Sequence, residues 1–133
     1  MSLNRRYISI LRTVIILVFI AYGCGLKEKK SNRLLKFDSE VWINDKNGCN
    51  GERLNLKNQL LSLKHNMRGF KTGEIENILG KPDAQELYER SQRYYIYFLD
   101  PGPKCENAVK KPQALFVRFS AVGIANEFTI KPL

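Results

Sequence analysis

The chain has 133 residues, and its 22 lysines and arginines outnumber 13 acidic residues, which gives a formal net charge of +9. This length suits one small domain with a modest core and argues against a multidomain protein. The positive residues are interspersed with acids and form no recognisable nucleic-acid motif, which argues against nucleic acid as a partner. The charge could favour anionic lipid head groups or an acidic protein partner, or be only a solvated surface.

The first feature along the chain is an apolar run over 13–23, preceded by Arg5, Arg6 and Arg12. A basic segment, an apolar core of roughly 7–15 residues and small residues at the cut are the parts of a secretory signal peptide. A membrane-spanning helix needs about 20 apolar residues, which this run reaches only with Arg12 inside the span. Residues 1–23 are therefore predicted to be a signal peptide, with an uncleaved anchor as the alternative.

The end of this run, Ala21-Tyr22-Gly23-Cys24, resembles the bacterial lipobox, where an aliphatic residue, two small residues and a cysteine mark the site of diacylation and cleavage. The resemblance implies a lipoprotein whose acylated Cys24 holds the membrane through palmitate-like chains, at ~0.8 kcal/mol per buried methylene. Gly25, in place of aspartate, implies sorting to the outer membrane, with the domain in the periplasm or exposed at the cell surface. The alternatives are a plain secretory signal, an anchor, or a cysteine without a special role.

Behind Cys24 the chain is predicted to have two parts. Residues 24–36 are charged and lack sustained periodicity, which indicates a flexible tether, and residues 37–133 form the single domain. Near its start, the segment 44–53 is rich in Asn, Asp and Gly and predicts a turn. Its acidic and amide residues have the spacing of calcium ligands, but Leu56 occupies the place of the required glutamate. No metal site is predicted.

The domain contains two cysteines, Cys49 and Cys105. Export places them where disulfides persist, so a Cys49–Cys105 bridge is the simplest interpretation, with two buried or free thiols as the alternative. Their separation excludes a CxxC redox motif, and a zinc site would need more ligands than a domain with the single histidine His65 offers. Closing the loop between them would stabilise the fold by about 4 kcal/mol in the chain-entropy model.

Two helices are predicted after the turn. An apolar stripe at steps of four, three and four residues indicates an amphipathic helix over 53–67, and its members are Leu56, Leu60, Leu63 and Met67. His65 lies off this stripe and is expected to face solvent. A shorter helix is expected to begin at an N-cap, Thr72, and to end at Gly80, because Pro82 prevents its continuation.

Two β-hairpins complete the predicted domain, with turns near Ser91 and Gly123. Their strands are expected at 84–90, 93–99, 114–120 and 124–130. Along 93–99 both faces are apolar or aromatic, so one face is expected to pack on the helices and the other to be partly exposed. The element order predicts an α+β fold, in which two helices pack on one face of a three- to four-stranded antiparallel meander as a two-layer sandwich.

The segment GFKTGEIENILGKPD, residues 69–83, resembles the signature of the SmpA/OmlA, or BamE-like, family of small outer-membrane lipoproteins. The residues that carry the resemblance are Gly69, Thr72, Ile75, Leu79, Gly80 and Pro82. Thr72 stands one place later than the family's Ser/Thr. The resemblance spans about residues 68–130 and implies the sandwich of BamE and of β-lactamase inhibitor proteins. The cysteine pair lies outside the family pattern. Such a motif specifies architecture and not an activity.

These features lead to two hypotheses for the function. The first is a non-enzymatic, membrane-anchored envelope lipoprotein that binds another envelope protein, such as an accessory or scaffold of outer-membrane assembly. Aromatic residues are enriched in interface cores, so the partner-binding candidates are Tyr94, Tyr97, Phe98 and Phe116, with packing of the domain as their alternative role. The second is an inhibitor or ligand-binding module that acts on an exported enzyme or envelope component through the loop 100–111.

No enzymatic activity, catalytic residue or cofactor is predicted. The chain has one histidine and shows no arrangement of a nucleophile with a base. Glu74 and Glu76 are two residues apart on a predicted helix, so their side chains diverge and do not form an acid pair.

Overall fold

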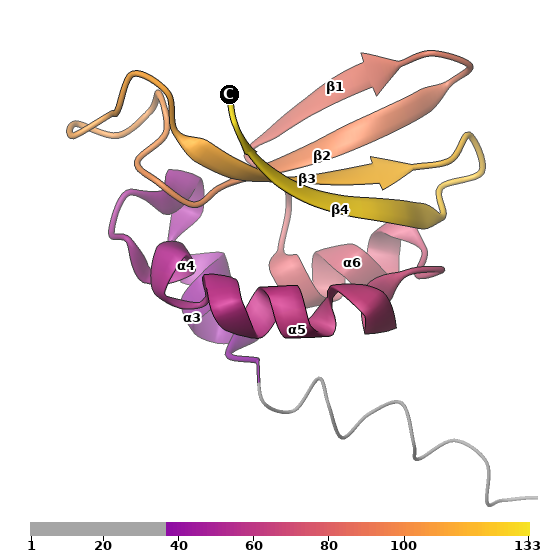
Figure 1. Ribbon diagram of the computed structural model, residues 1–133, viewed down its shortest axis with the longest axis horizontal. Coiled ribbons are helices and arrows are strands. Elements are labelled where there is room, and N and C mark those ends of the chain that lie inside the picture. The colour runs from indigo at the N-terminus through magenta and orange to yellow at the C-terminus, as the bar shows by residue number, and fades with distance from the viewer. Residues whose placement is uncertain (1–36) are drawn as a thin grey trace, which may run out of the picture. The chain divides into compact units, whose positions relative to one another are not determined.

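A computed structural model describes residues 37–133. The expected signal peptide, Cys24 and the tether 24–36 lie outside the described residues. In the described part, helices pack on one face of a four-stranded antiparallel sheet with the order β1-β2-β3-β4, and no helix covers the other face (Figure 1). The predicted α+β sandwich with an antiparallel meander is confirmed.

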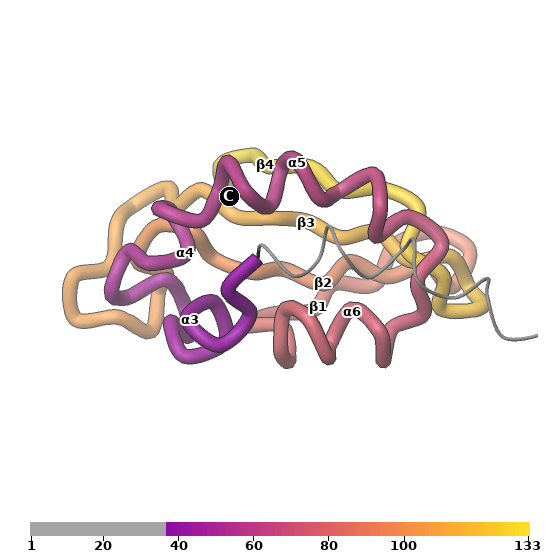
Figure 2. The backbone as a smooth tube through the Cα atoms, turned by 90° about the horizontal axis from the view of Figure 1, so that it is seen from below, coloured from indigo at the N-terminus to yellow at the C-terminus, as the bar shows by residue number. Residues whose placement is uncertain are grey.

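The helical layer contains four α-helices and one 3₁₀ turn among the described residues. Their bounds are α3 Ser39–Asn44, η1 Lys46–Gly48, α4 Glu52–Asn55, α5 Lys57–Met67 and α6 Thr72–Leu79. Seen from the helical side, α5 runs beneath the β3–β4 half of the sheet and α6 beneath the β1–β2 half (Figure 2). None of the helices between residues 37 and 133 is long and apolar enough to cross a membrane.

The first predicted helix is present, but it is divided at Leu56 into α4 and α5. The apolar stripe predicted for it is buried along its whole length, from Leu56 to Met67, and His65 is exposed as expected. The sequence did not predict α3, which begins where the Asp38 carboxylate accepts a hydrogen bond from the Val41 N–H at 3.1 Å.

The second predicted helix, α6, has its N-cap at Lys71, one residue before the expected Thr72. The Glu74 carboxylate accepts from the Lys71 N–H at 2.8 Å, so a side chain in the first turn stabilises this start. At the other end Gly80 has a φ of 72° and a ψ of −175°, a backbone conformation that only glycine adopts readily. Gly80 thus ends the helix as predicted.

The sheet consists of two hairpins, with β1 at Ala84–Tyr88, β2 at Gln92–Phe98, β3 at Gln113–Phe119 and β4 at Ala125–Pro132. The helix-facing side chains of the central strands join the helices in the main core, and they include Tyr95, Tyr97, Leu115, Val117 and Phe119. A smaller cluster on the opposite face consists of Ile96, Phe98, Ala114 and Phe116. The alternation predicted for these strands is therefore present. The outer face of 93–99, expected to be partly exposed, is instead buried at Ile96 and Phe98, which pack on β3.

Two glycines, one near each end of α6, give a matched test of this fold. A Cβ at Gly80 would meet Ile43 Cγ1 at 3.0 Å and would be strained by the positive φ, whereas a Cβ at Gly73 meets nothing within 4 Å. Gly80→Ala is expected to lower the free energy of unfolding by about 1–3 kcal/mol. Gly73→Ala is expected to be neutral or slightly stabilising. Urea unfolding checks both, and equal effects of the two substitutions would contradict the assigned helix end.

Candidate functional site

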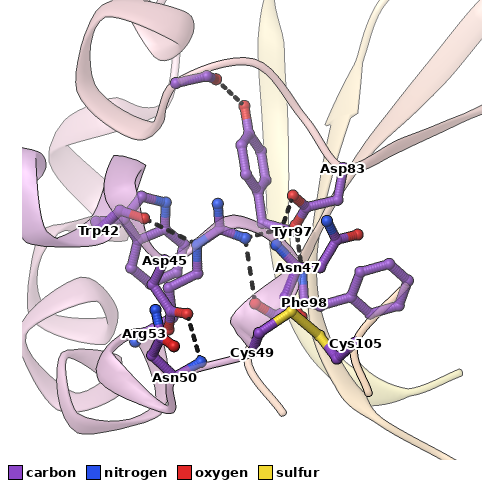
Figure 3. Close-up of polar contacts among 11 residues, drawn as sticks. Trp42, Asp45, Asn47, Cys49, Asn50, Arg53, Asp83, Tyr97, Phe98 and Cys105 are labelled. Carbon is purple, nitrogen blue, oxygen red and sulfur yellow. Dashed lines mark hydrogen bonds and ion pairs between the residues drawn. A yellow bond between two sulfur atoms is a disulfide. The ribbon is translucent and has the colours of Figure 1, made fainter. Parts of the chain in front are cut away.

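A buried ion pair lies beneath one end of the sheet (Figure 3). Arg53 on α4 is 1% exposed and pairs through Nη1 with Asp83, which directly precedes β1. Burying a charge is strongly unfavourable unless it is paired and hydrogen-bonded. The surrounding polar contacts therefore determine whether this end of the domain is stable.

The Arg53 side chain also contacts two further segments, α3 and β2. Its Nε donates to the Trp42 carbonyl at 2.9 Å, and its Nη1 donates to the Phe98 carbonyl at 3.3 Å. The guanidinium carbon lies 5.2 Å from the centre of the Trp42 ring and 5.8 Å from that of Tyr97, distances at which a cation is attracted to an aromatic face. Arg53 thereby joins the end of α3 to the end of β2.

The carboxylate of Asp83 connects the same end of the sheet to η1. Its Oδ1 accepts from the Asn47 N–H at 3.0 Å, and its Oδ2 accepts from the Phe98 N–H at 2.9 Å in addition to Arg53. Charge-assisted bonds of this kind are stronger than those between neutral groups. Asp83 is therefore saturated by groups of the protein itself.

Asp45, an acidic residue of the turn segment 44–53, is also buried, and its carboxylate accepts hydrogen bonds from the backbone. Its Oδ1 accepts from the Asn50 N–H at 2.8 Å and its Oδ2 from the Arg53 N–H at 2.9 Å. The first bond holds the turn before α4, and the second satisfies an N–H group in the first turn of the helix, which has no partner within the helix. Asp45 thus orients the helix that carries Arg53.

A tyrosine hydroxyl ties the end of α6 to the sheet. The Tyr97 hydroxyl donates to the Gly80 carbonyl at 2.9 Å. Burial, with the nearby Glu76 carboxylate as a second cause, raises the pKa of Tyr97 well above the ordinary value near 10. The pKa of Tyr95 is raised for the same two reasons. Tyr97 therefore remains a neutral hydrogen-bond donor.

The predicted disulfide between Cys49 and Cys105 is present and attaches the β2–β3 loop to the segment after η1. The loop is also held at Gly102, near its start. The Gly102 N–H donates to the Asn47 carbonyl at 2.9 Å, and a Cβ at Gly102 would lie only 2.7 Å from the Phe98 ring. These contacts hold the loop in one place against the end of the sheet.

A cleft of about 350 Å³ opens beside this framework, between η1, the α6–β1 connection and the β2–β3 loop. Apolar side chains and Asn47 line its interior, and the apolar ones are Ile43, Leu79 and Pro82. Three lysines from three different segments also line it, namely Lys46, Lys81 and Lys104. All three lysines are exposed, and none pairs with a side chain of residues 37–133. We call this feature the lysine cleft.

A second cleft, of about 480 Å³, lies between α5 and β4 and also contains three lysines, Lys57, Lys64 and Lys131. Two of them already have partners within the domain. Lys57 Nζ donates to the Gln113 side chain at 3.0 Å, and Lys131 Nζ lies 4.4 Å from the centre of the Phe116 ring. The second cleft therefore offers fewer uncommitted charges than the lysine cleft.

The aromatic residues predicted to bind a partner do not form an exposed patch. Tyr97 is 0% exposed and faces the helices, whereas Phe98 and Phe116, on the opposite face, are 3% and 4% exposed. Only Tyr94 is partly exposed, and its ring packs edge-on against Phe116 at a centroid distance of 6.1 Å. These rings therefore pack within the domain, which was the alternative role considered for them.

The residues of the BamE-like motif lie along α6 and at its two ends. Gly69, with a φ of 85°, donates its N–H to the Ala125 carbonyl at 2.8 Å, while Ile75 and Leu79 are fully buried. Pro82 directly precedes Asp83 and lines the lysine cleft. The C-terminal part of the motif, residues 79–82, therefore forms one wall of the cleft.

No family model matches this chain, and no curated protein or solved structure matches it either. The BamE-like resemblance therefore remains a prediction from the motif residues.

Sequence reasoning did not identify Arg53 and Asp83. One signal was present, because Arg53 precedes Leu56 by three residues and so extends the apolar stripe onto a charged position.

A double-mutant cycle tests the buried pair. Arg53→Met and Asp83→Asn each leave one buried charge without its partner, so each is expected to lower the free energy of unfolding by about 3–5 kcal/mol. The double variant removes both charges and is expected to be less destabilised than the sum of the singles, with a coupling of roughly 0.5–3 kcal/mol. Urea unfolding of all four proteins measures this coupling.

The control for this cycle is the outer-face pair of Arg118 and Glu127, which lie 2.9 Å apart with side chains 33% and 45% exposed. Its coupling is expected to stay below about 1 kcal/mol, because water screens exposed pairs. A coupling for Arg53 and Asp83 no larger than that of the exposed pair would contradict the role given to the buried one.

Proposed function

We propose that the protein is a non-enzymatic lipoprotein of the bacterial envelope, anchored through acylated Cys24, whose domain binds another envelope protein. The observation that carries the binding role is the lysine cleft, whose three cations have no side-chain partner among the described residues. Charged groups that a fold leaves uncommitted around an apolar recess are suited to a complementary partner. The lipobox-like residues 21–24 support the anchor.

A second candidate function is an inhibitor or ligand-binding module that acts on an exported enzyme or envelope component. The observation that favours it is the β2–β3 loop, which extends beyond the end of the sheet and is held by the disulfide and by Gly102 (Figure 1). A loop that is already ordered loses little conformational entropy when it enters the site of another protein. Substitutions at its exposed Val109 that leave every partner interaction intact would count against this function.

The anchor is tested by Cys24→Ser in the full chain, expressed in a bacterium that processes lipoproteins. The unaltered chain is expected in the membrane fraction, with an intact mass that corresponds to cleavage before Cys24 plus acyl chains. The Cys24→Ser chain is expected to leave that fraction, because it lacks the buried methylenes that hold it there. Cys49→Ser together with Cys105→Ser is the matched control and is expected to remain in the membrane. A full-length, unmodified and soluble native chain would refute the anchor.

A further inference from the structure

We propose that the lysine cleft binds an acidic peptide segment of the partner protein, with an apolar side chain of that segment seated between its carboxylates. The proposal rests on the proposed protein-binding function and names the chemistry of the partner. Its basis is the combination of charge, rigidity and lining chemistry found at this one cleft.

The charge of the cleft is strongly positive. Lys46 comes from η1, Lys81 from the α6–β1 connection and Lys104 from the β2–β3 loop. The one carboxylate that lines the cleft belongs to Asp83, and the ion pair with Arg53 already offsets its charge. A recess with low-dielectric walls focuses such a field and attracts anions. The occupant should therefore carry carboxylates that reach all three lysines.

The walls of the cleft are held in place before any ligand arrives. Asp83 binds the Asn47 N–H, Tyr97 binds the Gly80 carbonyl, and the disulfide fixes the loop that carries Lys104. A site whose frame is already ordered spends little binding free energy on ordering it. The lysine side chains and the side-chain amide of Asn47 are the groups that have to adjust to the occupant.

The lining indicates a peptide in preference to a simple anion. Ile43, Leu79 and Pro82 offer an apolar surface that a phosphate or an acetate ion would leave uncovered. Asn47 lines the same cleft, and its Oδ1 is buried without a hydrogen-bond partner in the described part of the chain. Rotation about its last side-chain bond lets this amide present either a donor or an acceptor, and a peptide unit offers both.

The proposal is tested with a fluorescein-labelled peptide of alternating glutamate and leucine, titrated against the full chain purified in detergent. Replacing Lys46, Lys81 and Lys104 together by glutamate is expected to weaken binding at least roughly tenfold, since each exposed charge pair contributes a few tenths to one kcal/mol. Raising the ionic strength is expected to weaken binding as well. A peptide with glutamine in place of glutamate is expected not to bind.

The second cleft provides the matched control. Glutamate at Lys57, Lys64 and Lys131 changes the net charge by the same amount and is expected to alter affinity by less than about threefold, because two of these lysines are already engaged. Asn47→Gly removes the amide but tolerates the φ of 58° found at this position, and it is expected to weaken binding several-fold with the fold retained. Urea unfolding of each variant verifies that retention.

Unchanged affinity of the lysine-cleft variant would overturn the proposal. So would an equal loss of affinity in the second-cleft variant, or equal binding of the glutamine peptide. Anionic lipid vesicles that bind through the same three lysines, and that the peptide does not displace, would also overturn it in favour of a lipid ligand. Chemical cross-linking of the full chain in bacterial membranes separates this proposal from the proposed function. If the lysine-cleft variant is still cross-linked to an envelope protein, this proposal fails and the proposed function stands. If the unaltered chain is cross-linked to no envelope protein, the proposed function itself fails.

Discussion

The buried pair of Arg53 and Asp83 is the constraint on which this end of the domain depends. Because two charges are removed from water, their remaining hydrogen-bonding capacity has to be met by the protein. This capacity is met by the Trp42 carbonyl, the backbone N–H of Asn47, and the N–H and carbonyl of Phe98. These groups come from α3, η1 and β2, so satisfying one ion pair connects two neighbouring helical segments to a strand that is distant in the sequence. The lysine cleft and the attached loop are built on that junction.

The framework also changes where recognition is expected to take place. Most of the aromatic residues predicted to bind a partner pack within the domain instead. Gly102 packs against the Phe98 ring, and Lys131 lies over the Phe116 ring. What remains available at the end of the sheet is a set of cations around an apolar recess. In the sequence, the excess of basic residues fitted either a solvated surface or an acidic partner. In the structure, three of these basic residues lie around one recess.

The parts of this fold that follow from local rules could be predicted from the sequence. The stripe from Leu56 to Met67, the stop at Gly80 and the alternation along β2 each depend on neighbours in the chain. The short helix α3 could not be predicted, because its surroundings have the composition of a turn. Arg53 was missed because its burial requires Asp83, thirty positions further on in the sequence. The spacing of Arg53 from Leu56 marks the buried face of the helix, but no local pattern identifies a partner that lies so far along the chain.

Hydrogen exchange at two backbone amides tests most directly whether the ion pair of Arg53 and Asp83 holds η1 against the sheet. The N–H groups of Asn47 and Phe98 both donate to the Asp83 carboxylate, one from a short turn and one from a strand. The account predicts that both amides exchange only through global unfolding, with the same free energy of opening. Exchange of the Asn47 amide at the rate of an exposed turn such as Ser91, while the Phe98 amide stays protected, would contradict it.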